Sequence, residues 1–188
     1  MPEIFSNDAT YSVMFYQHEI DFYRQIGERR YKMMRHAKVV DRLIAKNVDV
    51  VQNELLGLLG EAAVAELLGT EVRTAMNGYE GDGGISDMEV AETTVQVKTS
   101  WHRFGGLLFM NRWKFKADVG VLAVTNKKLD GLVMLPGWTT REEFREIAAD
   151  RLINDRPCAY LDQNRLRPIH TLTEYLGRQN GKFSEGEK

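Results

Sequence analysis

The chain has 188 residues, 43% hydrophobic and 28% charged, which is ordinary for a soluble globular protein and enough to bury a core. Its 25 basic and 27 acidic residues give a net charge of −2, which argues against a protein that coats nucleic acid nonspecifically but allows a local basic patch. A single cysteine, Cys158, excludes an internal disulfide and a zinc site of several cysteines, and it suits the reducing cytoplasm where we expect the protein. No apolar run approaches the roughly 18–20 residues of a membrane span and the first residues lack the pattern of a signal peptide, so we expect no membrane association.

The first predicted element is a helix over residues 11–46, which belongs to a basic N-terminal arm that we place at residues 1–48. Basic side chains far outnumber acidic ones between residues 24 and 46, and aromatic residues are interleaved with them. This pattern fits either an amphipathic helix with a solvated basic face or a surface that tracks phosphates. In the second interpretation the nucleic-acid-binding residues of the arm are Arg29, Arg30, Lys32 and Arg35.

The rest of the chain predicts a core domain over residues 49–180 and a polar tail at 181–188. The order of its elements indicates an α/β domain with a mixed central β-sheet flanked by helices. The elements are a helix over 49–68 that ends at Gly69, a glycine-rich loop at 77–84, strands at 85–91 and 94–100, a basic and aromatic loop at 101–116, a buried central strand at 117–125, a strand at 131–138 that ends at Pro136-Gly137, a helix over 140–153 capped by Thr139 or Thr140, and a short helix at 167–177.

Valine alternates with polar residues in the segment TTVQVKTS, residues 93–100, so Gln96 and Lys98 share one face of this strand. A hairpin loop around Glu92-Thr93 places Asp87 opposite Lys98 on the neighbouring strand. Such a pair is either a surface ion pair of small energetic value or part of a polar site.

Glu61 falls on the apolar stripe of the helix over 49–68 when its side chains are placed with a period of 3.6 residues. A carboxylate in that position is costly unless it is paired, protonated or bound to a metal. Glu61 is therefore either the partner of a basic side chain across a packing interface or part of a functional site.

Glu61 combined with the hairpin predicts a site for a hard cation. Oxygen ligands would come from the side chains of Asp87 and Gln96, the backbone carbonyl of Val97, and Glu61 directly or through water. This is the kind of ligand set that Mg²⁺ prefers, and Mn²⁺ can substitute for it. Lys98 beside the cation could orient or deprotonate an attacking water, or stabilise developing negative charge.

The motifs GLLGEAAVAELLG, GDGGISDMEV and TVQVKTS, in this order, resemble the PD-(D/E)xK nuclease superfamily with its restriction-endonuclease-like fold. The pattern is most similar to members with Gln-x-Lys, such as Mrr-type restriction enzymes, and it covers about residues 50–125. The resemblance implies a Mg²⁺-dependent nuclease that hydrolyses phosphodiester bonds, in DNA rather than RNA. It implies catalytic roles for Glu61, Asp87, Gln96 and Lys98.

Departures from the family pattern leave alternatives open. Gln96 is neutral where many members carry glutamate, so Mg²⁺ should bind more weakly, and Ser86 replaces the proline of the family name. Asp82, in the glycine-rich loop, is a rival for the role of Asp87. The competing function is a catalytically inactive nuclease-like module that binds DNA or a protein partner.

Polar residues near the end of the active strand are smaller predictions. Thr99, Ser100 and Arg103 could contact phosphate, although the first two could equally be polar residues at a strand end. Trp101 and Trp113 could stack on bases or pack under the loop. Nucleases of this kind often act as dimers, and the N-terminal helices could supply a homodimer contact.

Overall fold

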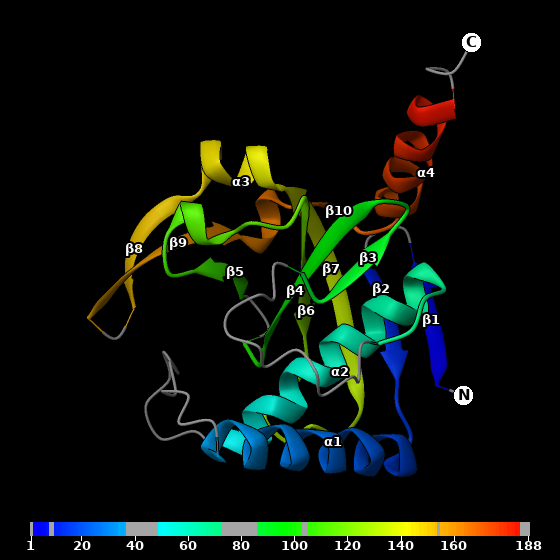
Figure 1. The fold of residues 1–188 in the computed structure, drawn as a ribbon, viewed down its shortest axis with the longest axis vertical. Helices are drawn as coiled ribbons and strands as arrows, with labels where there is room; N and C mark the ends of the chain where they lie inside the picture. Colours follow the sequence, from blue (N-terminus) through cyan, green and yellow to red (C-terminus); the bar gives the residue numbers. More distant parts are fainter. Residues whose placement is uncertain are drawn as a thin grey trace.

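The computed structural model describes residues 2–7, 10–36, 49–72, 86–102, 105–153 and 155–184, and its fold is drawn in Figure 1. Its elements are β1 (Glu3–Asn7), β2 (Thr10–Met14), α1 (Gln17–His36), α2 (Val50–Leu68), β3 (Met88–Val90), β4 (Thr93–Ser100), β5 (Gly106–Phe109), the 3₁₀ turn η2 (Arg112–Lys114), β6 (Val119–Val124), β7 (Leu132–Thr140), α3 (Arg141–Ile147), β8 (Ala149–Ile153), β9 (Arg156–Asp162), the 3₁₀ turn η3 (Gln163–Arg165), β10 (Arg167–Pro168) and α4 (Thr171–Ser184).

A mixed sheet forms the centre of the molecule, as the order of elements predicted. Its strands follow the order β1-β2-β7-β6-β4-β3, with β10 also paired to β7. The β4–β6 pair is parallel, and the other pairs of this sheet are antiparallel. The helix α2 crosses one face of the sheet and α1 runs beside α2, while a second sheet of order β5-β9-β8 lies to the other side (Figure 1). No helix in the described ranges is long and apolar enough to cross a membrane.

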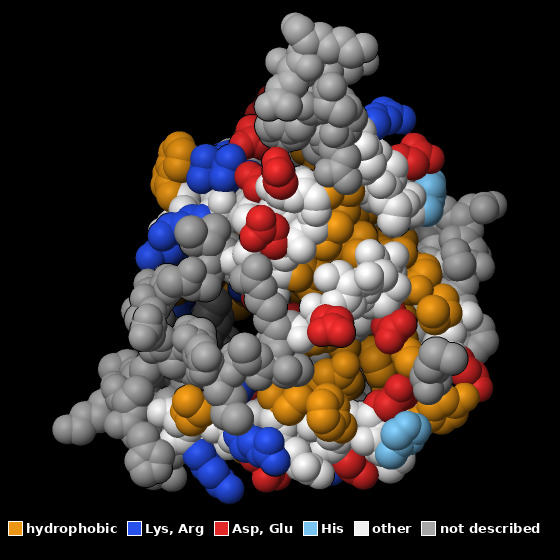
Figure 2. Space-filling model, turned by 45° about the vertical axis from the view of Figure 1, so that its right-hand side comes forward, with side chains coloured by type: hydrophobic (Ala, Val, Ile, Leu, Met, Phe, Trp, Pro, Cys, Tyr) orange, Lys and Arg blue, Asp and Glu red, His pale blue; other side chains and the backbone are white. Residues whose placement is uncertain are grey.

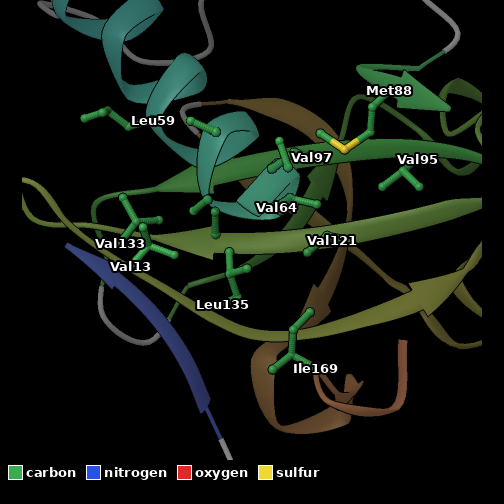
Figure 3. Close-up of a cluster of buried hydrophobic side chains, with 14 of the residues drawn as sticks. Val13, Leu59, Val64, Met88, Val95, Val97, Val121, Val133, Leu135 and Ile169 are labelled. Atoms are coloured by element: carbon green, nitrogen blue, oxygen red, sulfur yellow. The ribbon is translucent and has the colours of Figure 1, made fainter. Parts of the chain in front are cut away.

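The central strand β6 is buried along its whole length, which confirms the prediction for residues 117–125. Val121 belongs to the cluster between the sheet and α2, part of which is shown in Figure 3. Leu122 belongs to a second cluster, formed with the strands β5 and β9. Successive side chains of a strand point to opposite faces, so an uninterrupted apolar run is what two covered faces require.

The helix α2 begins and ends where the sequence predicts. The Asp49 side chain accepts a hydrogen bond from the Val51 N–H at 2.9 Å, and Gly69 adopts the left-handed conformation with φ of 62°. The helix lies very close to β4, because a Cβ atom added to Gly60 would lie 2.0 Å from Thr99 Oγ1. This close approach carries the next residue, Glu61, to the edge of the sheet.

The β3–β4 hairpin has a different register from the predicted one. Its two-residue loop is Ala91-Glu92, both residues have positive φ (53° and 60°), and Met88 pairs with Val95. Continuing this register places Asp87 beside Gln96, not opposite Lys98. The difference is two residues, so every side chain keeps its predicted face. The strand β3 covers only 88–90 of the predicted 85–91.

The predicted helix over residues 11–46 begins later, at Gln17. The residues before it form the β1–β2 hairpin, in which Val13 pairs with Val133 of β7. The helix α1 ends at His36 within the described range, and residues 37–46 lie outside it. The prediction was wrong for the first six residues because pairing to β7, a partner far along the chain, determines their conformation.

Two predicted ends in the C-terminal half are also wrong. β7 runs through Pro136-Gly137, because the register with β6 shifts between Leu122 and Val124 and a proline is tolerated at such a bulge. The helix predicted over 140–153 ends at Ile147, and the residues after Ala148 form β8, which pairs with β9.

Two further segments contain more regular structure than predicted. The loop predicted at 101–116 includes β5, which pairs with β9. The helix α4 covers most of the predicted 167–177 and continues to Ser184, into the predicted tail, and residues 185–188 lie outside the described range.

Candidate active site

Asp87 lies at the edge of β4, directly before the first residue of β3. Its backbone N–H donates to the Val95 carbonyl at 2.9 Å, and its Oδ2 accepts from the Val97 N–H at 2.6 Å. The carboxylate therefore replaces the backbone acceptor that a longer β3 would supply. Because the N–H and C=O of one strand residue face the same neighbour, the Val97 carbonyl points to this edge as well.

Glu61 comes to the same edge from α2. Its side chain is 16% exposed, and its Oε2 lies 3.9 Å from Nη1 of Arg30 on α1, which is equally buried. The basic partner that the sequence left open as an alternative therefore exists. At this distance the charge of Arg30 offsets only part of the free-energy cost of burying the Glu61 carboxylate.

The ionisable groups at this edge influence one another. Burial, reinforced by the negative charge of Asp87, raises the pKa of Glu61 to about 8, while the cations Arg30 and Lys98 oppose the shift. Burial also raises the pKa of Asp87, against the effects of Lys98, the Val97 N–H and Arg30. Two carboxyls and two cations from four different elements thus share one partly desolvated environment. We call these four residues, Arg30, Glu61, Asp87 and Lys98, the charged cluster.

Gln96 and Lys98 lie on the face of β4 that is turned away from α2. They pair with Gly120 and Leu122 of β6, and the Lys98 Nζ lies 5.3 Å from the centroid of the Phe109 ring. The Oε1 atom of Gln96 is buried and, among the described residues, has no hydrogen-bond partner. Buried polar atoms of this kind are rare, and one beside a cluster of carboxylates calls for a ligand.

The remaining predicted contacts are placed as follows. Thr99 lies in the packing between β4 and Gly60, and the Ser100 Oγ accepts a hydrogen bond from the His102 N–H at 3.0 Å. Arg29 and Lys32 are exposed on α1. The Arg35 side chain, Arg103 and the glycine-rich loop with Asp82 lie outside the described residues.

Figure 2 shows one face of the molecule, with the right-hand side of Figure 1 turned forward. On this face acidic and apolar side chains lie among uncharged polar ones, and the basic side chains lie mainly at the left and lower margins. For Trp101 and Trp113 the sequence allowed either stacking on bases or packing under the loop. Trp101 is partly buried against the core, and Trp113 is exposed.

Sequence reasoning did not assign Arg30 to the cluster, although it left open a basic partner for Glu61 and included Arg30 among possible phosphate contacts on this helix. The missing information was which of several arginines and lysines faces α2. The close approach of α1 at Gly27, where an added Cβ would lie 3.3 Å from Glu54 Cβ, determines this.

Within the described residues, no group of three or more histidine, cysteine, aspartate or glutamate side chains is arranged to hold a metal ion. A cation at this edge would thus depend on two carboxylates together with amide and backbone oxygens. Comparisons with models of protein families, with curated proteins and with solved structures found no match.

Proposed function

We propose that the protein is a metal-dependent nuclease of the PD-(D/E)xK type, which hydrolyses phosphodiester bonds in DNA. The observation that carries the proposal is the charged cluster at the edge of β4, with the unpartnered Gln96 Oε1 next to it on the same strand. Perturbed carboxyls brought together from separate elements are typical of functional sites.

The residues at this edge fit a hard divalent cation. Both carboxyls have pKa values raised by burial, and the buried Gln96 Oε1 has no hydrogen-bond partner among the described residues, so a bound cation would stabilise all three groups. Mg²⁺ would be held by Asp87, Gln96, the Val97 carbonyl and Glu61, and Mn²⁺ could take its place. When bound, such an ion lowers the pKa of a coordinated water and neutralises charge on a phosphate.

In this proposal Lys98 acts on the nucleophile. Its ammonium projects over the Phe109 ring and is close enough to Asp87 and Glu61 to affect both carboxyls. From there it can orient a water molecule by hydrogen bonding and stabilise the negative charge that develops on the phosphate.

Arg30 supplies the second cation of the cluster. With Lys98 it brings two positive charges to the cluster, so the site with a bound divalent cation would attract an anionic phosphodiester. A guanidinium can bind two phosphate oxygens at once, which a lysine cannot do. The helix α1 would in this way contribute directly to the cleavage site.

A second candidate function is a nuclease-like module that binds DNA without cutting it. The neutral Gln96 favours this alternative, because it removes one negative charge from the proposed metal site.

Cleavage assays with Mg²⁺ or Mn²⁺ on linear duplex, branched and single-stranded DNA test the proposal. We expect the wild type to cut at least one of these substrates, and Asp87→Asn and Lys98→Ala to abolish cutting. Glu89→Gln and Lys128→Ala are matched controls, because both side chains are exposed and lie outside the cluster. Cleavage that survives both cluster variants would refute the site assignment, and metal-independent binding without cutting on any substrate would favour the second function.

A further inference from the structure

Trp113, in η2, presents a large aromatic side chain to solvent. It is 71% exposed, whereas Trp138 is buried within the core. Tryptophan is mostly buried in folded proteins, so this position calls for an explanation. Met110, at the start of the same loop, is also exposed, at 48%.

The backbone and ring of Trp113 are held firmly. The Asn111 side chain accepts hydrogen bonds from the N–H groups of Trp113 and Lys114, both at 3.0 Å. The Arg145 guanidinium lies 5.0 Å from the centroid of the indole and is itself fixed by a hydrogen bond from its Nη2 to the Phe115 carbonyl at 3.2 Å. The indole is therefore supported by the protein while most of its surface stays open. Such an aromatic surface can stack on a ligand at little entropic cost.

Most acidic groups near Trp113 already have basic partners. Arg112 pairs with Asp150 at 3.2 Å. Arg141 pairs with Asp118 at 3.5 Å and with Glu142 at 3.1 Å. These pairs neutralise the acidic side of α3 and β8.

Two lysines next to Trp113 in the sequence are without such partners. Lys114 and Lys116 are exposed, and no ion pair or hydrogen bond within the described part of the chain engages their ammonium groups. With Arg145 they add positive charge to this part of the chain, where the exposed carboxylates of Glu142 and Asp150 are paired with arginines and Glu146 is a third exposed carboxylate. An exposed aromatic face in the same short segment as two such lysines complements a ligand with both aromatic rings and negative charges. We call Trp113, Lys114 and Lys116 the Trp113 surface.

The Trp113 surface lies on the same side of the central sheet as Lys98. The Lys98 ammonium lies over the Phe109 ring, and Phe109 stacks on Phe115 with centroids 4.7 Å apart. Phe115 follows Trp113 by two residues, so the segment that carries the exposed indole is anchored in the aromatic cluster beneath Lys98.

We propose that the Trp113 surface binds a single-stranded segment of nucleic acid, with one base stacked on the indole and phosphates paired with the two lysines. Stacking on a fixed aromatic side chain is independent of base sequence, whereas a duplex keeps its base faces covered. The idea that a strand bound at this surface continues to Lys98 rests on the proposed nuclease function. Binding at Trp113 itself does not require cleavage.

Equilibrium binding of a labelled single-stranded oligonucleotide and of the same sequence as a duplex, both in EDTA, tests the proposal. We expect Trp113→Ala to weaken single-strand binding about tenfold or more, with duplex binding nearly unchanged. Trp113→Phe should retain much of the affinity, and Met110→Ala is the control for a general loss of exposed apolar surface. Replacing each lysine by glutamine should lower the slope of log affinity against log salt by roughly 0.7.

Tryptophan fluorescence gives a second measurement. Single strands should quench the emission of the wild type and of Met110→Ala, and the quenching should disappear in Trp113→Ala, whose melting temperature should stay unchanged. Equal loss of single-strand and duplex affinity, or quenching that persists without Trp113, would overturn the proposal. Because EDTA prevents metal-dependent cutting, a wild type that cleaves nothing would refute the nuclease function and leave this result intact.

Discussion

Replacement of Glu61 by glutamine should change how the stability of the metal-free protein depends on pH. The pKa of Glu61 is raised from 4.5 to about 8 in the folded protein, mainly by burial and then by the charge of Asp87. Below pH 4.5 both the folded and the unfolded chain hold this proton. Between the two pKa values the unfolded chain releases the proton and the folded chain keeps it, so the free energy of unfolding falls as pH rises.

The size of this effect follows from the shift. Each pH unit in this window removes at most about 1.4 kcal/mol from the free energy of unfolding, so the whole window removes up to about 5 kcal/mol. Glutamine keeps the shape of the side chain without ionising. The variant Glu61→Gln should therefore resemble the wild type near pH 5 and become the more stable protein near pH 9, although it should lack nuclease activity.

Urea unfolding in EDTA at several pH values between 5 and 9 measures this difference. Glu66→Gln is the matched control, because Glu66 lies on the same helix but is exposed. Adding Mg²⁺ at pH 9 should stabilise the wild type more than Glu61→Gln, since a bound ion stabilises only the protein that can hold it. If the free energy of unfolding changes with pH by the same amount in the wild type and in Glu61→Gln between pH 5 and pH 9, the reasoning is refuted.

Four other predictions concern single substitutions. Gly57→Ala should stabilise the protein by up to about 1 kcal/mol, because no atom lies within 4 Å of the added methyl group. Gly60→Ala should destabilise it by roughly 1–3 kcal/mol, because its methyl group would collide with Thr99, and thermal unfolding distinguishes the two. Gln96→Glu should lower the Mg²⁺ concentration needed for half-maximal cleavage, and an unchanged Mg²⁺ titration would argue against Gln96 as a ligand. Thr140→Ala, which breaks the capping box of α3, should cost about 1 kcal/mol in urea unfolding.

Local signals predicted the elements whose conformation depends on their own residues. The cap at Asp49 and the stop at Gly69 bound α2 because both act within one turn of the helix. The uninterrupted apolar run of β6 predicted a strand covered on both faces, because the side chains that point to each face are all apolar. The same reasoning put Glu61 on the inner side of α2, where it lies.

Elements that depend on distant partners were predicted less well. The hairpin loop was misplaced because Ala91 and Glu92 have positive φ without the asparagine or glycine that usually marks such a turn. Residues 149–153 follow a helix and contain good helix formers, yet pairing with β9 makes them a strand. Sequence reasoning also had no means to show that Trp113 is exposed, because exposure depends on what packs around η2.

The sequence by itself determined the polar face of TTVQVKTS and the unusual position of Glu61, since both follow from the periods of a strand and a helix. Only the tertiary structure decided that Asp87 binds the edge of β4 through the Val97 N–H, and that Arg30 of α1 pairs with Glu61. Those contacts join α1, α2, β3 and β4, and no local pattern encodes which residues of separate elements meet. The charge balance of the candidate site is therefore a property of the fold.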